Sequence, residues 1–219
     1  MSESKKPIAD AARRLSGRGD TRQALINGAL KLLDGDKSFD SLSLRELTRA
    51  VGVVPTAFYR HFADMEELGL ALVEECFRTL RKILADMRKD TRAGSVPIAA
   101  IVKSLIQHVQ KHRRHFRFIA SERYSGDGLV RQAVRREMRL VQSELSTDLA
   151  RLDVFRSWSV EDLQMAAGVL LNHMVAIADE ILEQTRAGER PRKELMSLAE
   201  KQLRLVVLGL PHWRSDAAI

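Results

Sequence analysis

The sequence contains a single cysteine, Cys76, among its 219 residues. An intrachain disulfide cannot form, and a reducing cytoplasm is therefore the expected compartment. Long apolar runs are also missing, because the longest weakly polar stretch, residues 165–178, is interrupted by Asn172 and His173. No such run lies near the N-terminus either, so neither export nor membrane insertion is expected.

Sequence motifs of common enzyme classes are absent as well. The chain has no Gly-rich phosphate loop, no nucleophile elbow and no convincing metal triad. The Gly126-Asp127-Gly128 segment is interpreted as a turn. We therefore predict no catalytic residue, no metal ligand and no cofactor, with an enzyme kept as a rival interpretation.

Alternating β-branched runs bounded by turns are lacking, whereas apolar residues recur about every 3.6 positions through almost the whole chain. This periodicity predicts an all-α protein. A polar segment, residues 1–19, is expected to be a flexible basic arm, followed by a three-helix head at 20–63 and a helical body at 64–219. Within the body, helices are expected from Asp64 to about Gly94 and at 95–111, 115–123, 128–152, 159–187 and 191–209.

Positive charge is concentrated at the front of the chain. The net charge is +7, and residues 1–62 carry 11 Lys and Arg against 7 Asp and Glu. A basic surface favours a polyanionic partner such as nucleic acid.

The head contains strong helix-boundary signals. Ser43 followed by Glu46 is a capping box, and Leu42 and Leu47 are spaced for a hydrophobic staple, so a helix is expected to begin at Ser43. Gly52 can take the left-handed conformation that ends a helix. A proline three residues later suits the first position of another helix, which predicts helix, short turn, helix.

The third helix of the head is predicted to be about two turns long. At 100° per residue, Phe58 and Phe62 share one face and are expected to be buried against the preceding helices. The opposite face carries Thr56, Ala57 and Arg60, with Tyr59 and His61 on its two flanks.

This outer face suits the major groove of DNA. Arg60 can donate to guanine O6 and N7, and Ala57 and the Thr56 methyl can meet thymine methyls. Tyr59 and His61 are placed to reach phosphates. The alternative is that the aromatic residues are core and the charges a solvated face, and a nonspecific DNA-packing protein is a further rival.

The segment Phe58-Tyr59-Arg60-His61-Phe62, preceded by this head and followed by a long helix, resembles the signature of the TetR family of bacterial repressors. The stretch from Ser41 to Phe62, continued by Asp64 and Glu67-Leu-Gly-Leu, is more specifically similar to the branch that represses unsaturated fatty-acid synthesis (FabR-like and DesT-like). The closer similarity covers about 30 residues. A weaker one continues through Phe116-Arg-Phe and Ser121-Glu-Arg.

The resemblance implies a homodimer that binds a palindromic double-stranded operator and holds a small hydrophobic effector in its body. For this branch it implies a long-chain acyl-CoA as effector and lipid-synthesis genes as targets. Two features depart from the family pattern: Val54 replaces a capping Ser or Thr, and Asp64 stands near a position where many members have a phosphate-contacting Lys. We therefore expect more of the DNA contact to come from Thr21, Arg22, Ser43 and Arg45.

Two segments of the body, residues 159–187 and 191–209, are apolar on more than one side. One face of each can be buried in its own subunit and another in a partner, which predicts a four-helix dimer interface. The alternative is a single thick monomer core. A two-fold dimer would present two heads about 34–36 Å apart, or a multiple of this spacing, along the duplex.

The segment between Lys103 and Arg117 carries five Lys and Arg and no acid. Ordinary surface charge is one interpretation, and His108, His112 and His115, at i, i+4 and i+7, leave metal sensing open as another. A third interpretation assigns the arginines to the phosphates of coenzyme A and nearby apolar residues to the acyl chain. The effector residues predicted on this basis are Arg113, Arg114, Phe116, Arg117, Phe118, Ile119, Met165 and Met174.

Overall fold

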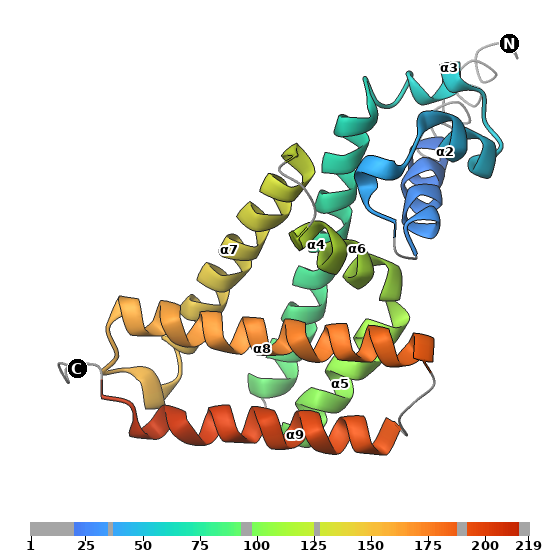
Figure 1. The fold of residues 1–219 in the computed structure, drawn as a ribbon. Helices are drawn as coiled ribbons and strands as arrows, with labels where there is room; N and C mark the ends of the chain where they lie inside the picture. Colours follow the sequence, from blue (N-terminus) through green and yellow to red (C-terminus); the bar gives the residue numbers. More distant parts are fainter. Residues whose placement is uncertain (1–19, 35–36, 93–97, 125–127, 188–191, 215–219) are drawn as a thin grey trace, which may run out of the picture.

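The computed structural model describes residues 20–34, 37–92, 98–124, 128–187 and 192–214 (Figure 1). The predicted basic arm, together with Gly35, Gly94 and Gly188, lies outside these residues. Every regular element within the described residues is helical, which confirms the all-α prediction.

The head comprises a helix through residues 20–32, the 3-10 turn η1 and two short helices. In the body, the helices begin and end within a few residues of the predicted positions. The described elements after the first helix are η1 (Phe39–Ser41), α2 (Leu44–Val51), α3 (Pro55–Phe58), α4 (Met65–Arg92), α5 (Ile98–Lys111), α6 (Arg113–Tyr124), α7 (Leu129–Leu149), η2 (Asp153–Phe155), α8 (Val160–Ala187), α9 (Arg192–Gly209) and η3 (Leu210–His212).

The long helix α4 connects the head to the body (Figure 1). Its N-terminus is closed by a reciprocal cap, because Asp64 Oδ1 accepts the Glu67 N–H at 2.8 Å and Glu67 Oε2 accepts the Ala63 N–H at 2.5 Å. The Asp64 carboxylate is therefore used to start α4, where its charge also suits the helix dipole.

The head and the body share one apolar core. This core includes Leu25 and Leu47 from the head, Phe77 from α4, Phe118 from α6 and Val134 from α7, all almost completely buried. A second cluster joins α5, α8 and α9. Because the first core is continuous, a shift of α4 or α6 in the body will also displace side chains of the head.

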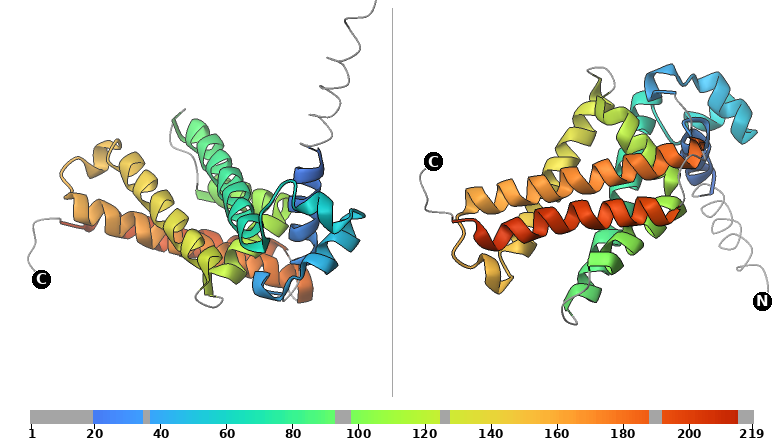
Figure 2. Two further views of the ribbon diagram at one scale, coloured as in Figure 1. Left: turned by 90° about the horizontal axis from the view of Figure 1, so that it is seen from above. Right: turned by 60° about the horizontal axis from the view of Figure 1, so that its bottom comes forward.

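Helices α8 and α9 run side by side (Figure 2). Their outer surface exposes large apolar side chains, among them Met165, Val169, Leu205 and Leu208. Part of α8, Val160–Glu183, is long and apolar enough to cross a membrane, and 39% of its most apolar window is buried. Core helices of soluble proteins have the same composition, so this single helix is weak evidence for a membrane span.

Candidate nucleic-acid interface and effector cavity

The start of α2 is fixed by Ser43, whose side-chain oxygen accepts the Glu46 N–H at 3.1 Å. The predicted capping box is only half formed. The Glu46 carboxylate instead binds Lys37 Nζ at 2.6 Å, because the loop before α2 brings this cation within reach. The serine cap is sufficient to start the helix where the sequence predicted.

The turn between α2 and α3 depends on Gly52, which has a φ of 76°. In this left-handed conformation its N–H reaches the Thr48 carbonyl at 3.0 Å, and the Val53 N–H reaches the same oxygen at 3.0 Å. A side chain at this position would be strained, since a residue with a Cβ atom rarely adopts such a φ. The predicted helix, turn, helix arrangement is therefore formed.

Helix α3 is shorter than predicted, with one α-helical turn followed by a further turn. Pro55 occupies its first position and Val54 supplies no side-chain cap. The chain nevertheless continues to coil, because the N–H groups of His61 and Phe62 both donate to the Phe58 carbonyl, at 2.8 and 3.1 Å. So short an element has no stability of its own and must be held by packing.

That packing comes from the two phenylalanines. Phe58 and Phe62 are 0% and 1% exposed, and their ring centroids lie 5.5 Å apart. The Arg22 guanidinium from the first helix covers the Phe62 ring at 5.1 Å. The prediction that these rings are buried is therefore confirmed.

The predicted DNA-facing residues lie on the other side of α3. Thr56, Tyr59 and Arg60 are exposed, with Tyr59 58% exposed, while Ala57 and His61 are half-buried. The Tyr59 ring packs edge-on against Phe58, with centroids 5.5 Å apart. This contact orients the phenol without burying it.

The remaining predicted contacts are distributed over the first helix and α2. Arg45 is exposed and shares an open hollow with Ser43 and Arg49. Arg49 was not among the predicted DNA contacts, although its spacing of four from Arg45 places both on one helix face. Thr21 is half-buried, and Arg22 is exposed but lies over the Phe62 ring.

The body contains an apolar cavity between α4, α5, α6, α7 and α8. The space open to the centre of a water molecule is only about 50 Å³. Of the predicted effector residues, Phe116, Ile119 and Met174 line this cavity. The full lining comprises Leu80, Leu84, Leu105, Phe116, Ile119, Ala120, Met138, Leu171, Met174, Val175, Ala178 and Asp179.

Two predicted effector residues lie elsewhere. Phe118 is 1% exposed and belongs to the core shared with the head. Met165 is 42% exposed, outside the cavity lining. Helical periodicity explains both errors, because it identifies apolar positions but not which of several faces borders a cavity.

Asp179 is the one ionisable residue in the cavity wall. Burial raises the pKa of its carboxyl group, Arg123 opposes this shift and Glu183 adds to it, and the net pKa is above the ordinary value. A charge in so apolar a wall is costly unless it meets a partner.

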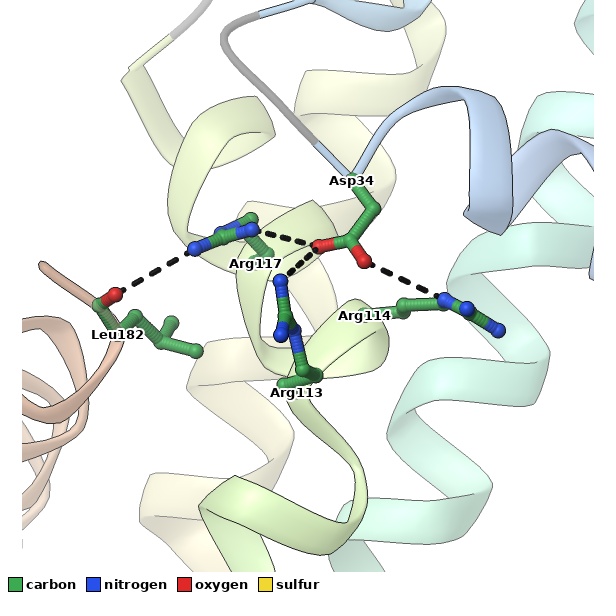
Figure 3. Close-up of polar contacts among 5 residues, drawn as sticks. All are labelled: Asp34, Arg113, Arg114, Arg117 and Leu182. Carbon is green, nitrogen blue, oxygen red and sulfur yellow. Dashed lines mark hydrogen bonds and ion pairs between the residues drawn. The ribbon is translucent and has the colours of Figure 1, made fainter. Parts of the chain in front are cut away.

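The three arginines predicted to bind coenzyme A phosphates instead surround Asp34 of the head (Figure 3). Arg113 Nη2 and Arg117 Nη1 lie 3.4 and 2.6 Å from Asp34 Oδ1, and Arg114 Nε lies 3.3 Å from Oδ2. Arg117 is 7% exposed and also donates to the Leu182 carbonyl of α8 at 3.4 Å. These arginines join the head to the body.

Electrostatics favour this junction. Burial raises the pKa of the Asp34 carboxyl, but the charge of Arg113 and the hydrogen bond and charge of Arg117 outweigh burial, so the pKa lies below its ordinary value. Sequence analysis did not predict this contact, because Asp34 and Arg117 are 83 positions apart. An acid from the head neutralises a segment that contains no acid of its own.

Glu122 of α6 forms a second connection to the head. Its Oε1 accepts the Phe39 backbone N–H of η1 at 2.8 Å and the Ser121 hydroxyl at 3.2 Å. The Glu122 side chain is almost completely buried, and burial raises the pKa of its carboxyl group despite these two hydrogen bonds. Sequence analysis did not select this residue.

The three histidines whose spacing left metal sensing open as an alternative lie where α5 ends at Lys111 and α6 begins at Arg113. His108 Nδ1 lies 2.8 Å from the Ser104 carbonyl, and the His112 and His115 rings meet edge to face at 5.7 Å. Within the part of the chain that the structure describes, no group of three His, Cys, Asp or Glu residues is arranged to hold a metal.

Residues 25–72 match the family model described as bacterial regulatory proteins, tetR family. The match covers the first helix, the helix-turn-helix and the start of α4, and so includes the segment that exposes Arg60. The head of the chain is therefore similar to that of TetR-family regulators.

Solved structures of TetR-like regulators have the same fold. A transcriptional regulator from Rhodococcus sp. Rha1 is 16% identical, with a TM-score of 0.64 over 90% of this chain and 99% of that one. The fatty acid degradation regulator FadR from Bacillus halodurans is 13% identical, with a TM-score of 0.61 over 87% and 94%. FadR from Bacillus subtilis in complex with stearoyl-CoA is also 13% identical, with a TM-score of 0.57 over 85% and 98%.

Proposed function

We propose that this regulator is a dimeric cytoplasmic repressor whose DNA binding is controlled by a long-chain acyl-CoA, and that it governs fatty-acid synthesis or desaturation genes. Three features support the proposal. The head exposes Arg60 on a pinned helix, the body contains an apolar cavity, and a FadR protein of the same fold binds stearoyl-CoA. A different hydrophobic compound is the alternative effector.

The proposal that a ligand regulates DNA binding rests on the position of α6, which lies between the cavity and the head. On one side Phe116, Ile119 and Ala120 line the cavity. On the other, Arg117 and Glu122 bind the head at 2.6 and 2.8 Å. A ligand that displaces α6 therefore acts on the head directly.

The size of the cavity gives this coupling a physical cause. Ligand-binding pockets commonly measure about 300–1,000 Å³, whereas this cavity opens only about 50 Å³ to water. A long acyl chain must separate the surrounding helices to enter. Because the core is continuous into the head, the expanded and collapsed states will present the recognition helices differently, and the ligand regulates by its differential affinity for the two.

The second subunit is proposed to cover the exposed face of α8 and α9. Leu205 is 76% and Leu208 62% exposed, too much apolar surface for two adjacent turns to leave in water. Pairing this face with its symmetry copy forms a four-helix interface and orients both heads toward one duplex. A Leu205→Glu/Leu208→Glu variant should be monomeric by light scattering, whereas an Arg156→Glu control, at a side chain that is 80% exposed and outside both helices, should remain dimeric.

The function is tested with a duplex selected from a random library by the purified protein. Binding of this duplex is followed by fluorescence anisotropy during titration with palmitoyl-CoA, an unsaturated acyl-CoA and free coenzyme A. We expect acyl-CoA to change the operator affinity by about 5–150-fold, the usual range of allosteric coupling, with unequal effects of the two chains. Free coenzyme A should have little effect. If both acyl thioesters leave the affinity unchanged, the lipid-sensor proposal fails while DNA binding stands.

A further inference from the structure

Helix α7 separates two surface grooves that differ in charge. One lies against α4 and is lined by Arg78, Arg81 and Arg136 together with the acids Glu74 and Glu137. The other lies against α6 and α8 and is lined by Arg123, Arg135 and Arg139, with no acid in its lining. The two grooves are similar in volume, about 450 and 370 Å³. The two grooves can therefore be compared for how far their arginines are paired with acids.

In the first groove two of the three arginines, Arg78 and Arg81, form ion pairs. Arg81 donates to Glu137 Oε2 at 2.8 Å and to Glu144 Oε1 at 2.8 Å. Arg78 pairs with Glu75 of its own helix. This groove has the features of a structural ion-pair network between α4 and α7, with little positive charge left for a ligand.

In the second groove two of the three cations have no acidic partner within the described part of the chain. Among the residues that the structure describes, Arg135 and Arg139 have no ion-pair partner, and their spacing of four places both on one face of α7. Arg123 donates to the neutral Asn172 amide oxygen at 2.7 Å and lies 5.4 Å from the Tyr124 ring centroid. The three guanidinium groups thus line one groove, and Asp179 of the neighbouring cavity wall is an acid whose pKa the charge of Arg123 lowers.

The second groove adjoins the apolar cavity. Met138 and Leu171 line both of them, so these two side chains form the boundary between a cationic surface and an apolar interior. A molecule with a fatty chain and an anionic headgroup matches a cationic groove beside an apolar cavity. The chain would be covered by the helices and the headgroup would stay at the surface, where its charge is solvated.

We propose that the groove formed by Arg123, Arg135 and Arg139 binds the phosphate-bearing headgroup of the effector whose acyl chain enters the cavity. This inference rests on the proposed function. It assigns the headgroup to a different set of arginines from Arg113, Arg114 and Arg117, because those three are already bound to Asp34. Guanidinium groups suit phosphate because each offers several N–H donors in a fork that matches its oxygens. Tyr124 and Gln142 add polar groups at the same surface.

The proposal is tested by removing the groove's charge while keeping the cavity intact. The Arg135→Gln/Arg139→Gln variant alters two exposed side chains of α7, and Arg78→Gln/Arg136→Gln is the matched control, with the same loss of net charge in the first groove. Binding of palmitoyl-CoA, 1-palmitoyl lysophosphatidate and palmitate to each full-length protein is measured by isothermal titration calorimetry. Circular dichroism confirms that both variants are folded.

We expect Arg135→Gln/Arg139→Gln to bind palmitoyl-CoA at least about tenfold more weakly than the native protein, since charge-assisted hydrogen bonds are lost. The control should bind it as the native protein does. Palmitate, which lacks phosphate, should bind all three proteins within about a factor of two. A matching loss for lysophosphatidate would extend the site to phosphate esters in general, and an unchanged lysophosphatidate affinity would restrict it to the phosphates of coenzyme A.

Three results would overturn the assignment of the groove, and they differ in whether the proposed function also fails. If palmitoyl-CoA binds both variants as tightly as the native protein and still changes operator binding, the groove is not the headgroup site but the proposed function stands. If both variants lost affinity for palmitoyl-CoA to the same extent, the effect would come from the net charge of the protein, and this groove would not be the headgroup site. If the native protein binds no palmitoyl-CoA, the proposed function fails together with the groove.

Discussion

In the head, residues 41–62 supply a cap, a left-handed turn and a pinned helix in one continuous stretch. In the body, the cavity is assembled from five helices whose lining residues run from Leu80 to Asp179. The head is organised by short-range spacing, whereas the cavity exists only after the helices have packed. The proposed DNA-binding surface is thus encoded locally, whereas the proposed effector site is a product of the tertiary fold.

Among the variants that test this difference between head and body, Phe58→Ala is expected to have the largest effect. The side chain is fully buried, so its removal should lower the free energy of unfolding by about 3–5 kcal/mol and release α3 from the head. Operator binding should be lost even at temperatures where the variant remains folded. Guanidinium denaturation and anisotropy measure the two effects, and Tyr59→Ala, at an exposed neighbour, should leave stability nearly unchanged.

If Phe58→Ala loses little stability, the recognition helix is not held by its phenylalanines and the contrast between head and body disappears. The same conclusion would follow if Tyr59→Ala destabilised the protein to the same extent.

The same contrast explains what the sequence could predict. The role of Gly52, the burial of Phe58 and Phe62 and the exposure of Arg60 all follow from helical periodicity and turn chemistry within a few residues. The helices of the body were also predicted closely, because each has its own apolar repeat. Local patterns in the sequence therefore predict where helices form and which of their faces are buried.

The cavity and the junction were predicted less well for the same physical reason. Phe118 and Phe116 are two residues apart on α6, yet one is in the shared core and the other in the cavity lining. Arg117 was assigned to a ligand because its partner, Asp34, is remote in sequence. Which cation meets which acid depends on how the helices pack, and no single-segment pattern contains that information.

The junction between the two regions is tested by Asp34→Asn. Removing this charge leaves three arginines close together, one of them buried, and should lower the free energy of unfolding by about 3 kcal/mol at pH 7. The Asp153→Asn control alters an acid that is 86% exposed and should have almost no effect. Equal stability of Asp34→Asn and the native protein would show that the head does not depend on this contact.

The effect of Asp34→Asn should also depend on pH. Because the folded-state pKa of Asp34 is lowered, its stabilising contribution is present above the unfolded-state value of about 3.8 and is lost as pH falls through the lower folded-state value. The stability difference between native protein and variant should therefore narrow below about pH 4. Urea denaturation across this range measures the change, and a pH-independent difference would contradict a charge-based role.

A smaller effect is expected at Glu122, the second contact between α6 and the head. Glu122→Ala removes the acceptor of the Phe39 N–H and should cost about 1–3 kcal/mol of stability. Glu122→Gln keeps an acceptor and removes a carboxylate whose pKa is raised by burial, so it should equal or exceed the native stability at pH 7.

The pH dependence of Glu122 has the opposite sign to that of Asp34. Its raised folded-state pKa makes a contribution that is fully present below the unfolded-state value of about 4.5 and is lost as pH rises through the folded-state value. The advantage of Glu122→Gln should therefore shrink at low pH. Chemical denaturation at pH 4 and pH 7 tests this, and equal damage by Gln and Ala would refute the hydrogen-bonding role assigned here.

The central claim, that the outer face of α3 reads base pairs, is tested most directly by Arg60→Ala on the selected operator and on duplexes that differ from it at single positions. We predict a loss of about 1–3 kcal/mol in operator binding and a relaxed preference at one base pair. Arg45→Ala, at a predicted phosphate contact, should weaken all duplexes alike. If Arg60→Ala also weakened every duplex equally, Arg60 would not be reading a base and the claim would be contradicted.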